Sequence, residues 1–115
     1  MSNCYPELNQ RILEMAEGDD EFRVELTSAI YTGLLELQVV YAEACLAKDE
    51  VRIQQIRHKI KPTLSMFEFD RLADALQQGK EIMESEGFGT AFDAHLQIFL
   101  KNVGEALAEV GRLKN

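Results

Sequence analysis

Apolar residues recur at intervals of three and four along four long stretches of this chain, and this periodicity limits its fold more than any other feature. Such spacing places apolar side chains on one face of an α-helix, whereas a half-buried strand alternates at every second residue. Only two of the 115 residues are proline, and the β-branched residues are scattered rather than clustered. The pattern therefore predicts an all-α protein.

Capping and turn signals divide the pattern into one short helix and four long ones. They are a short helix from Pro6 to Gly18, a long one from Asp19 to about Ala47, and further long ones that start near Asp49, Asp70 and Thr90. Thr90 and Asp93 resemble a capping box at the start of the last helix. Short connections between amphipathic helices favour an antiparallel four-helix bundle with a short additional N-terminal helix, formed by residues 1–115 as a single domain.

Charge and cysteine content narrow the classes of partner. The chain has 20 acidic and 12 basic residues, and a net charge of −8 repels nucleic acid and anionic lipid. No apolar run approaches the roughly 20 residues of a membrane-spanning helix, and the first residues lack the features of a signal peptide. Cys4 and Cys45 fit no zinc or disulfide pattern and are interpreted as free thiols. We expect a cytoplasmic protein that binds proteins, with no nucleic-acid or membrane partner.

One histidine falls on the polar side of the helix predicted after Asp49. At about 100° per residue, the apolar positions from Ile53 to Phe67 occupy a stripe about 80° wide. His58 lies roughly 160° from the centre of that stripe, so its imidazole is expected to face solvent. The second histidine, His95, adjoins the apolar stripe of the last helix and is expected to be packed in a structural role.

Basic residues surround His58 in a chain that is acidic as a whole. Lys61 lies one turn along on the same side, where its ammonium can reach an anion on the imidazole, and Arg57 and Lys59 add positive charge. A solvated basic face explains these charges equally well. Pro62 cannot donate to the carbonyl of residue 58, which loosens the helix beside the imidazole; alternatively, Pro62 begins a separate helical turn after a break.

These residues resemble the histidine-containing phosphotransfer (HPt) domain family of two-component phosphorelays. The family motif H-x-[LI]-K-G matches residues 58–62, which read HKIKP, at the histidine, the aliphatic position and the second lysine. Residues 18–26, GDDEFRVEL, are similar to the family's G-D-x-x-F-x-x-E-L opening of the preceding long helix. The resemblance covers roughly residues 8–110 and implies the bundle fold.

The chain also departs from the family pattern. Pro62 replaces the usual glycine, and Glu68 stands where a second glycine is common. In a gap-free alignment, Lys80 occupies the position at which many members place a Gln or Glu that hydrogen-bonds the imidazole. A charged lysine can neutralise phosphate but cannot accept that bond, so Gln77 or Gln78 is an alternative acceptor.

The resemblance implies a phosphocarrier rather than a stand-alone enzyme. His58 would be the phosphoacceptor and Lys61 its phosphate-neutralising neighbour, with a secondary binding set of Lys59, Arg57, Pro62 and Lys80.

Response-regulator receiver domains would be the partners, with a hybrid sensor histidine kinase as a further candidate. Mg²⁺ would be held by the receiver, so this chain would need no cofactor or metal site. Motifs of an independent kinase or hydrolase are absent. A helical adaptor, or a regulatory domain that binds a kinase or receiver without being phosphorylated, remains an alternative.

Overall fold

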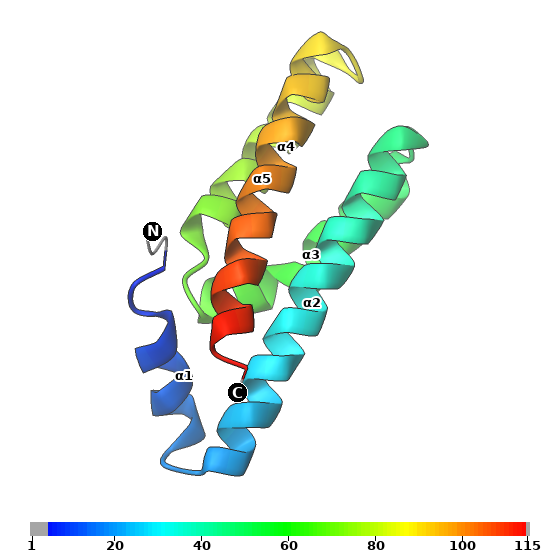
Figure 1. Cartoon of the computed structure of the whole chain (residues 1–115). Coiled ribbons are helices and arrows are strands. Elements are labelled where there is room, and N and C mark those ends of the chain that lie inside the picture. The colour runs from blue at the N-terminus through cyan, green and yellow to red at the C-terminus, as the bar shows by residue number, and fades with distance from the viewer. Residues whose placement is uncertain (1–4, 115) are drawn as a thin grey trace.

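The computed structural model describes residues 5–114, and within this range all regular structure is helical. The predicted fold class, all-α, is therefore confirmed. The helices are α1 (Leu8–Ala16), α2 (Asp20–Leu46), α3 (Glu50–Met66), α4 (Asp70–Glu86) and α5 (Thr90–Arg112), as Figure 1 shows.

Aspartate side chains cap two of the long helices as the sequence predicts. At the start of α2, Asp19 accepts a hydrogen bond of 3.0 Å from the backbone N–H of Phe22. At the start of α3, Asp49 accepts one of 3.1 Å from the backbone N–H of Arg52. Each bond satisfies an N–H group that has no partner inside its helix, so the two caps define where α2 and α3 begin.

Two other helix starts differ from the prediction. The capping box at Thr90 is wrong, because the extended backbone of Gly89 forms the N-cap and Thr90 is already the first helical residue. α1 begins at Leu8 rather than at Pro6. The backbone N–H of Leu8 donates to the carbonyl of Tyr5 at 3.1 Å, so Pro6 sits inside a turn, where its fixed φ is equally suitable.

The four long helices pack so that each has two long neighbours. α2 contacts α3 and α5, α4 contacts the same two helices, and α1 packs on α2. Consecutive long helices run in opposite directions (Figure 1). The pair formed by α2 and α3 moves apart from the pair formed by α4 and α5 toward the ends that carry the 47–49 and 87–89 connections (Figure 1). The largest completely buried side chains are Ile12, Leu34, Leu37, Tyr41, Ile53, Phe69, Leu72, Phe99, Val103 and Val110. Burying each of the aliphatic and phenylalanine side chains in this set contributes about 1.5–3 kcal/mol to folding.

α2 is long and apolar enough, by length and composition, to cross a membrane, and it is the one such helix among residues 5–114. The expectation that no apolar run is long enough to span a membrane holds only for uninterrupted runs, because Glu36 and Glu43 interrupt this one. The core helix of a soluble protein passes the same test, and 33% of the apolar stretch is buried here. Packing in the core therefore accounts for part of its apolar character.

The turn between α3 and α4 contains a strained residue. Glu68 adopts a left-handed backbone with φ of 55°, and the backbone N–H of the next residue, Phe69, donates to the carbonyl of Leu64 at 2.8 Å. Lys48 has the same conformation, with φ of 54°, after α2. Glycine favours this region, so a glycine at position 68 would fit the turn without strain.

Candidate functional site

His58 projects from the exposed face of α3. The buried residues of this helix are Ile53, Ile56, Ile60 and Leu64. The His58 side chain lies on the opposite face and is exposed, which confirms the expectation from the helical wheel. One face of α3 is therefore anchored in the core, while the other presents the imidazole to solvent.

α3 continues through Pro62 without a break. The helix spans Glu50–Met66, so the alternative in which Pro62 begins a separate turn is wrong. Because proline has no N–H, the carbonyl of His58 lacks its usual hydrogen bond from four residues along. Both residues are exposed.

Two of the basic side chains on α3 are held by acidic residues of α2. Lys59 Nζ lies 2.9 Å from Oε1 and 3.0 Å from Oε2 of Glu36. Arg52 forms a similar ion pair with Glu43 at 3.3 Å. Lys59, which sequence reasoning placed beside His58, thus extends toward α2. Glu36 had no sequence signal of its own, because it lies 23 residues from Lys59 and only helix packing brings the two together.

Arg57 is less exposed than the neighbouring His58. Its Nη1 atom is buried and has no hydrogen-bond partner among residues 5–114. Burial and the neighbouring Cys45 raise the pKa of the Tyr41 hydroxyl, and Arg57 is close enough to oppose that shift. One end of the guanidinium is therefore buried, while Arg57 as a whole is half-buried.

The two lysines that the sequence assigns to phosphate neutralisation, Lys61 and Lys80, have no ion-pair partner in the part of the chain that the structure describes. Lys61 is exposed on α3, and Lys80 is half-buried on α4. α3 and α4 are neighbours. His58 lies eight residues before the end of α3 (66 − 58), and Gln78 lies eight after the start of α4 (78 − 70), so the two are at a similar level. Lys80 is therefore close to the level of His58 on the adjacent helix.

The glutamines considered as orienting acceptors do not bind the imidazole. Gln77 is exposed and donates its side-chain amide to Glu81 at 3.1 Å. Gln78 is also exposed. Within the described range, the His58 ring has no hydrogen-bond partner.

The second histidine forms a buried cluster, as expected. His95 is 6% exposed, and its Nε2 lies 2.8 Å from the Tyr41 hydroxyl. Burial lowers the pKa of His95, which favours a neutral ring. The backbone of Gly79 leaves the room for this contact, because a Cβ there would lie 2.3 Å from Nε2. Gly104, by contrast, has no neighbouring atom within 4 Å of an added Cβ.

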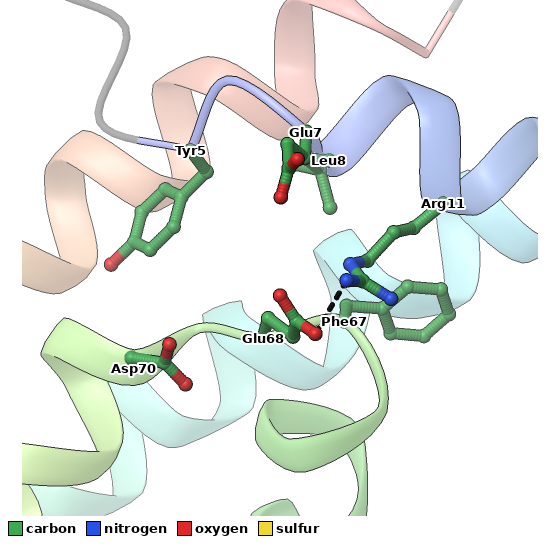
Figure 2. A pocket seen from close by; sticks show the side chains of 7 residues that line it. All are labelled: Tyr5, Glu7, Leu8, Arg11, Phe67, Glu68 and Asp70. Atoms are coloured by element: carbon green, nitrogen blue, oxygen red, sulfur yellow. Dashed lines mark ion pairs between the residues drawn. The ribbon is translucent and has the colours of Figure 1, made fainter.

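A pocket of about 150 Å³ lies elsewhere, between the start of α1 and the turn before α4. Figure 2 shows Arg11 of α1 paired with Glu68 of that turn across the opening. The residues that line the pocket are Tyr5, Glu7, Leu8, Arg11, Phe67, Glu68 and Asp70. None of the basic residues of α3 belongs to this set, so the pocket is separate from the surface around His58.

The cysteines give no sign of nucleophilic chemistry. Cys45 is a buried free thiol, and burial raises its pKa to about 12, so it is protonated at neutral pH. Cys4 lies outside the described residues. Among residues 5–114, no group of three or more His, Cys, Asp and Glu side chains could hold a metal ion.

Comparison with known proteins adds no assignment. No family model, no curated protein and no solved structure matches this chain. The case for a function therefore depends on the surface around His58.

Proposed function

We propose that this chain is a histidine phosphocarrier of a two-component phosphorelay, with residues 1–115 forming one HPt-like domain. In this proposal the fold is an antiparallel four-helix bundle with a short additional N-terminal helix, which the order of helix contacts supports. The main supporting observation is the exposed imidazole of His58 on a continuous core-anchored helix, with Lys61 one turn away and without an ion-pair partner among residues 5–114. We place the protein in the cytoplasm, with no nucleic-acid or membrane partner.

The proposed reaction is a reversible transfer between a receiver aspartate and His58. A ring nitrogen of the neutral imidazole attacks the phosphorus of an aspartyl phosphate, forming a P–N bond. The bond between phosphorus and the acyl oxygen breaks, and its electron pair leaves with the aspartate carboxylate. A second receiver reverses these steps. Such a transfer depends mainly on positioning and charge stabilisation, so a histidine on a rigid helix and nearby cations are sufficient on this side.

The neighbouring residues divide into two groups in this proposal. Lys61 and Lys80 neutralise the phosphoryl oxygens, because both lie near the level of His58 and neither has an ion-pair partner in the described part of the chain. Lys59, Arg57 and Pro62 act less directly, since the first is paired and one end of the second is buried. The partners are response-regulator receiver domains, with a hybrid sensor histidine kinase as a further candidate, and Mg²⁺ belongs to the receiver. This chain is not an enzyme by itself.

The test is phosphoryl transfer from phosphorylated receiver domains in the presence of Mg²⁺. We expect the purified protein to gain an acid-labile phosphate that peptide mass spectrometry locates on His58. The His58→Gln variant should keep its circular dichroism spectrum and gain none. A wild-type protein that stays unphosphorylated with every donor would refute the proposal.

A non-catalytic adaptor or regulatory domain is the second candidate, and exposed apolar residues on α2 favour it. Leu35, Val39 and Leu46 are 42%, 47% and 81% exposed, and their spacing places them on one side of the helix. Such a stripe is suited to binding another protein. This candidate predicts that binding to a kinase or receiver persists in His58→Gln and that no phosphate is accepted.

A further inference from the structure

We propose that Glu36 is a positioning residue that holds Lys59 away from the phosphoryl group on His58 and thereby slows phosphoryl acceptance. This inference rests on the proposed function of His58. Glu36 comes from α2 and Lys59 directly follows His58 on α3, so the ion pair joins the proposed site to a neighbouring helix.

The ammonium of Lys59 lies where it can bind either the Glu36 carboxylate or a phosphoryl group on His58. Its Nζ lies within 3.0 Å of both carboxylate oxygens of Glu36. Consecutive side chains on a helix point about 100° apart, and the four-carbon lysine stem is flexible enough to turn from α2 toward a group on His58. A phosphoryl dianion and the Glu36 carboxylate therefore compete for one ammonium.

The exposure of the ion pair makes this competition effective. The side chains of Lys59 and Glu36 are 66% and 41% exposed. An ion pair in this environment is weak, so the ammonium can exchange between partners without a large cost. Removing the carboxylate would leave Lys59 available to the phosphoryl group.

Among the basic residues of α3, Lys59 is the one whose charge could be freed for a phosphoryl group on His58. Arg52 is paired with Glu43, and the Nη1 atom of Arg57 is buried. Of the basic side chains on α3, only Lys61 is exposed and has no ion-pair partner among the described residues. Freeing Lys59 would thus double the unpaired lysines on this helix beside a phosphoryl group.

The experiment measures phosphorylation of His58 by phosphoramidate, which needs no receiver. The imidazole nitrogen attacks phosphorus, the P–N bond of phosphoramidate breaks, and ammonia leaves with the electron pair. We expect Glu36→Gln to raise the rate about two- to fivefold, the range that the free energy of an exposed ion pair allows. Glu43→Gln is the matched control, because it breaks a similar α2–α3 ion pair whose cation lies six residues before His58, and its rate should equal that of the wild type.

A double variant tests whether Lys59 mediates the effect. In Lys59→Gln the rate should not rise, and Glu36→Gln/Lys59→Gln should match it. A rate increase that persists without Lys59 would mean that Glu36 simply repels the donor, and this would overturn the inference. So would an equal rate in Glu36→Gln and the wild type. Thermal unfolding of Glu36→Gln and Glu43→Gln should shift equally, because both lose one exposed pair.

Failure of the proposed function can be distinguished from failure of this inference. If the wild-type protein accepts no phosphoryl group, the phosphocarrier proposal fails. Inorganic phosphate then serves as the probe, with binding followed by the NMR shifts of the His58 imidazole. Tighter phosphate binding by Glu36→Gln than by Glu43→Gln supports the competition for Lys59, and equal binding overturns it.

Discussion

The Tyr41 hydroxyl lies 2.8 Å from Nε2 of His95, and this buried hydrogen bond joins α2 to α5. α4 makes room for it at Gly79, where an added Cβ would lie 2.3 Å from Nε2 and 2.8 Å from the Tyr41 hydroxyl. Three helices therefore meet at this buried polar contact. Its consequences for stability can be tested independently of the proposed function.

Gly79→Ala should destabilise the protein. The added methyl group overlaps His95 and Tyr41, and overpacking of this kind costs about 1–3 kcal/mol. Gly104→Ala is the matched control in α5, where no atom lies within 4 Å of the new Cβ. There, the substitution should stabilise the helix by about 0.5–1 kcal/mol. Urea unfolding measures both changes, and an equal sign for the two would contradict the assigned contact.

Stability should fall as the pH drops below about 6.5, because burial lowers the pKa of His95 from its ordinary value of 6.5. In that range the unfolded chain binds a proton that the folded chain excludes, so protonation favours unfolding. Above pH 6.5 His95 is neutral in both states and does not lower the free energy of unfolding. That free energy decreases as the pH falls from 6.5 toward the lower pKa of His95 in the folded state. Urea unfolding from pH 7.5 to pH 5 should show a steeper loss for the wild type than for His95→Gln. Parallel curves would be inconsistent with a neutral buried imidazole.

Lys48→Gly should stabilise the turn between α2 and α3. Lys48 has φ of 54°, a left-handed conformation that costs an ordinary residue about 1 kcal/mol relative to glycine. Lys48 forms no ion pair in the described range, so little is lost with its side chain. Glu68→Gly relieves the same strain but removes the ion pair with Arg11, and we expect a smaller gain. Thermal unfolding compares the two, and a loss of stability in Lys48→Gly would disprove the strain argument.

The elements that the sequence predicts well are those fixed by local signals. The spacing of apolar residues places the helices, and Asp19 and Asp49 mark two starts because each caps a backbone N–H three residues along. The last helix start was missed because the extended backbone at Gly89, rather than the Thr90 hydroxyl, forms its N-cap. The exposure of His58 also follows from one helix alone, since four buried positions on α3 define the opposite face.

The surroundings of His58 could not be predicted in the same way, because they depend on neighbouring helices. Sequence proximity suggested that Arg57 and Lys59 share a surface with His58. Packing instead buries the Nη1 atom of Arg57 and pairs Lys59 with Glu36 on α2. A helical wheel gives the direction of a residue from its own axis, but it does not say which charges an adjacent helix supplies.

Lys61→Gln should slow phosphorylation of His58 by phosphoramidate. Lys61 is exposed one turn from His58 and has no ion-pair partner among residues 5–114, so its ammonium is available to phosphoryl oxygens. Loss of one exposed cation should reduce the rate about two- to fivefold. Lys101→Gln removes the same charge from α5, which does not contact α3, and should leave the rate unchanged. Equal rates in the two variants would remove Lys61 from the site.

Lys80 distinguishes charge neutralisation from orientation of the imidazole. Lys80→Met removes the charge and supplies no strong acceptor, whereas Lys80→Gln removes the same charge and adds an amide oxygen that can accept from a ring N–H. If the half-buried Lys80 only neutralises phosphate, both variants should shorten the lifetime of phosphohistidine about equally. If the His58 ring, which has no hydrogen-bond partner in the described chain, is limited by its orientation, Lys80→Gln should be phosphorylated faster than Lys80→Met. We expect Lys80→Gln to be phosphorylated faster than Lys80→Met, because an acceptor orients the free imidazole. We expect the lifetime of phosphohistidine to shorten about equally in both variants, because a cation stabilises the phosphorylated ring. ³¹P NMR measures both quantities in one experiment, and wild-type values in both variants would exclude Lys80 from the site.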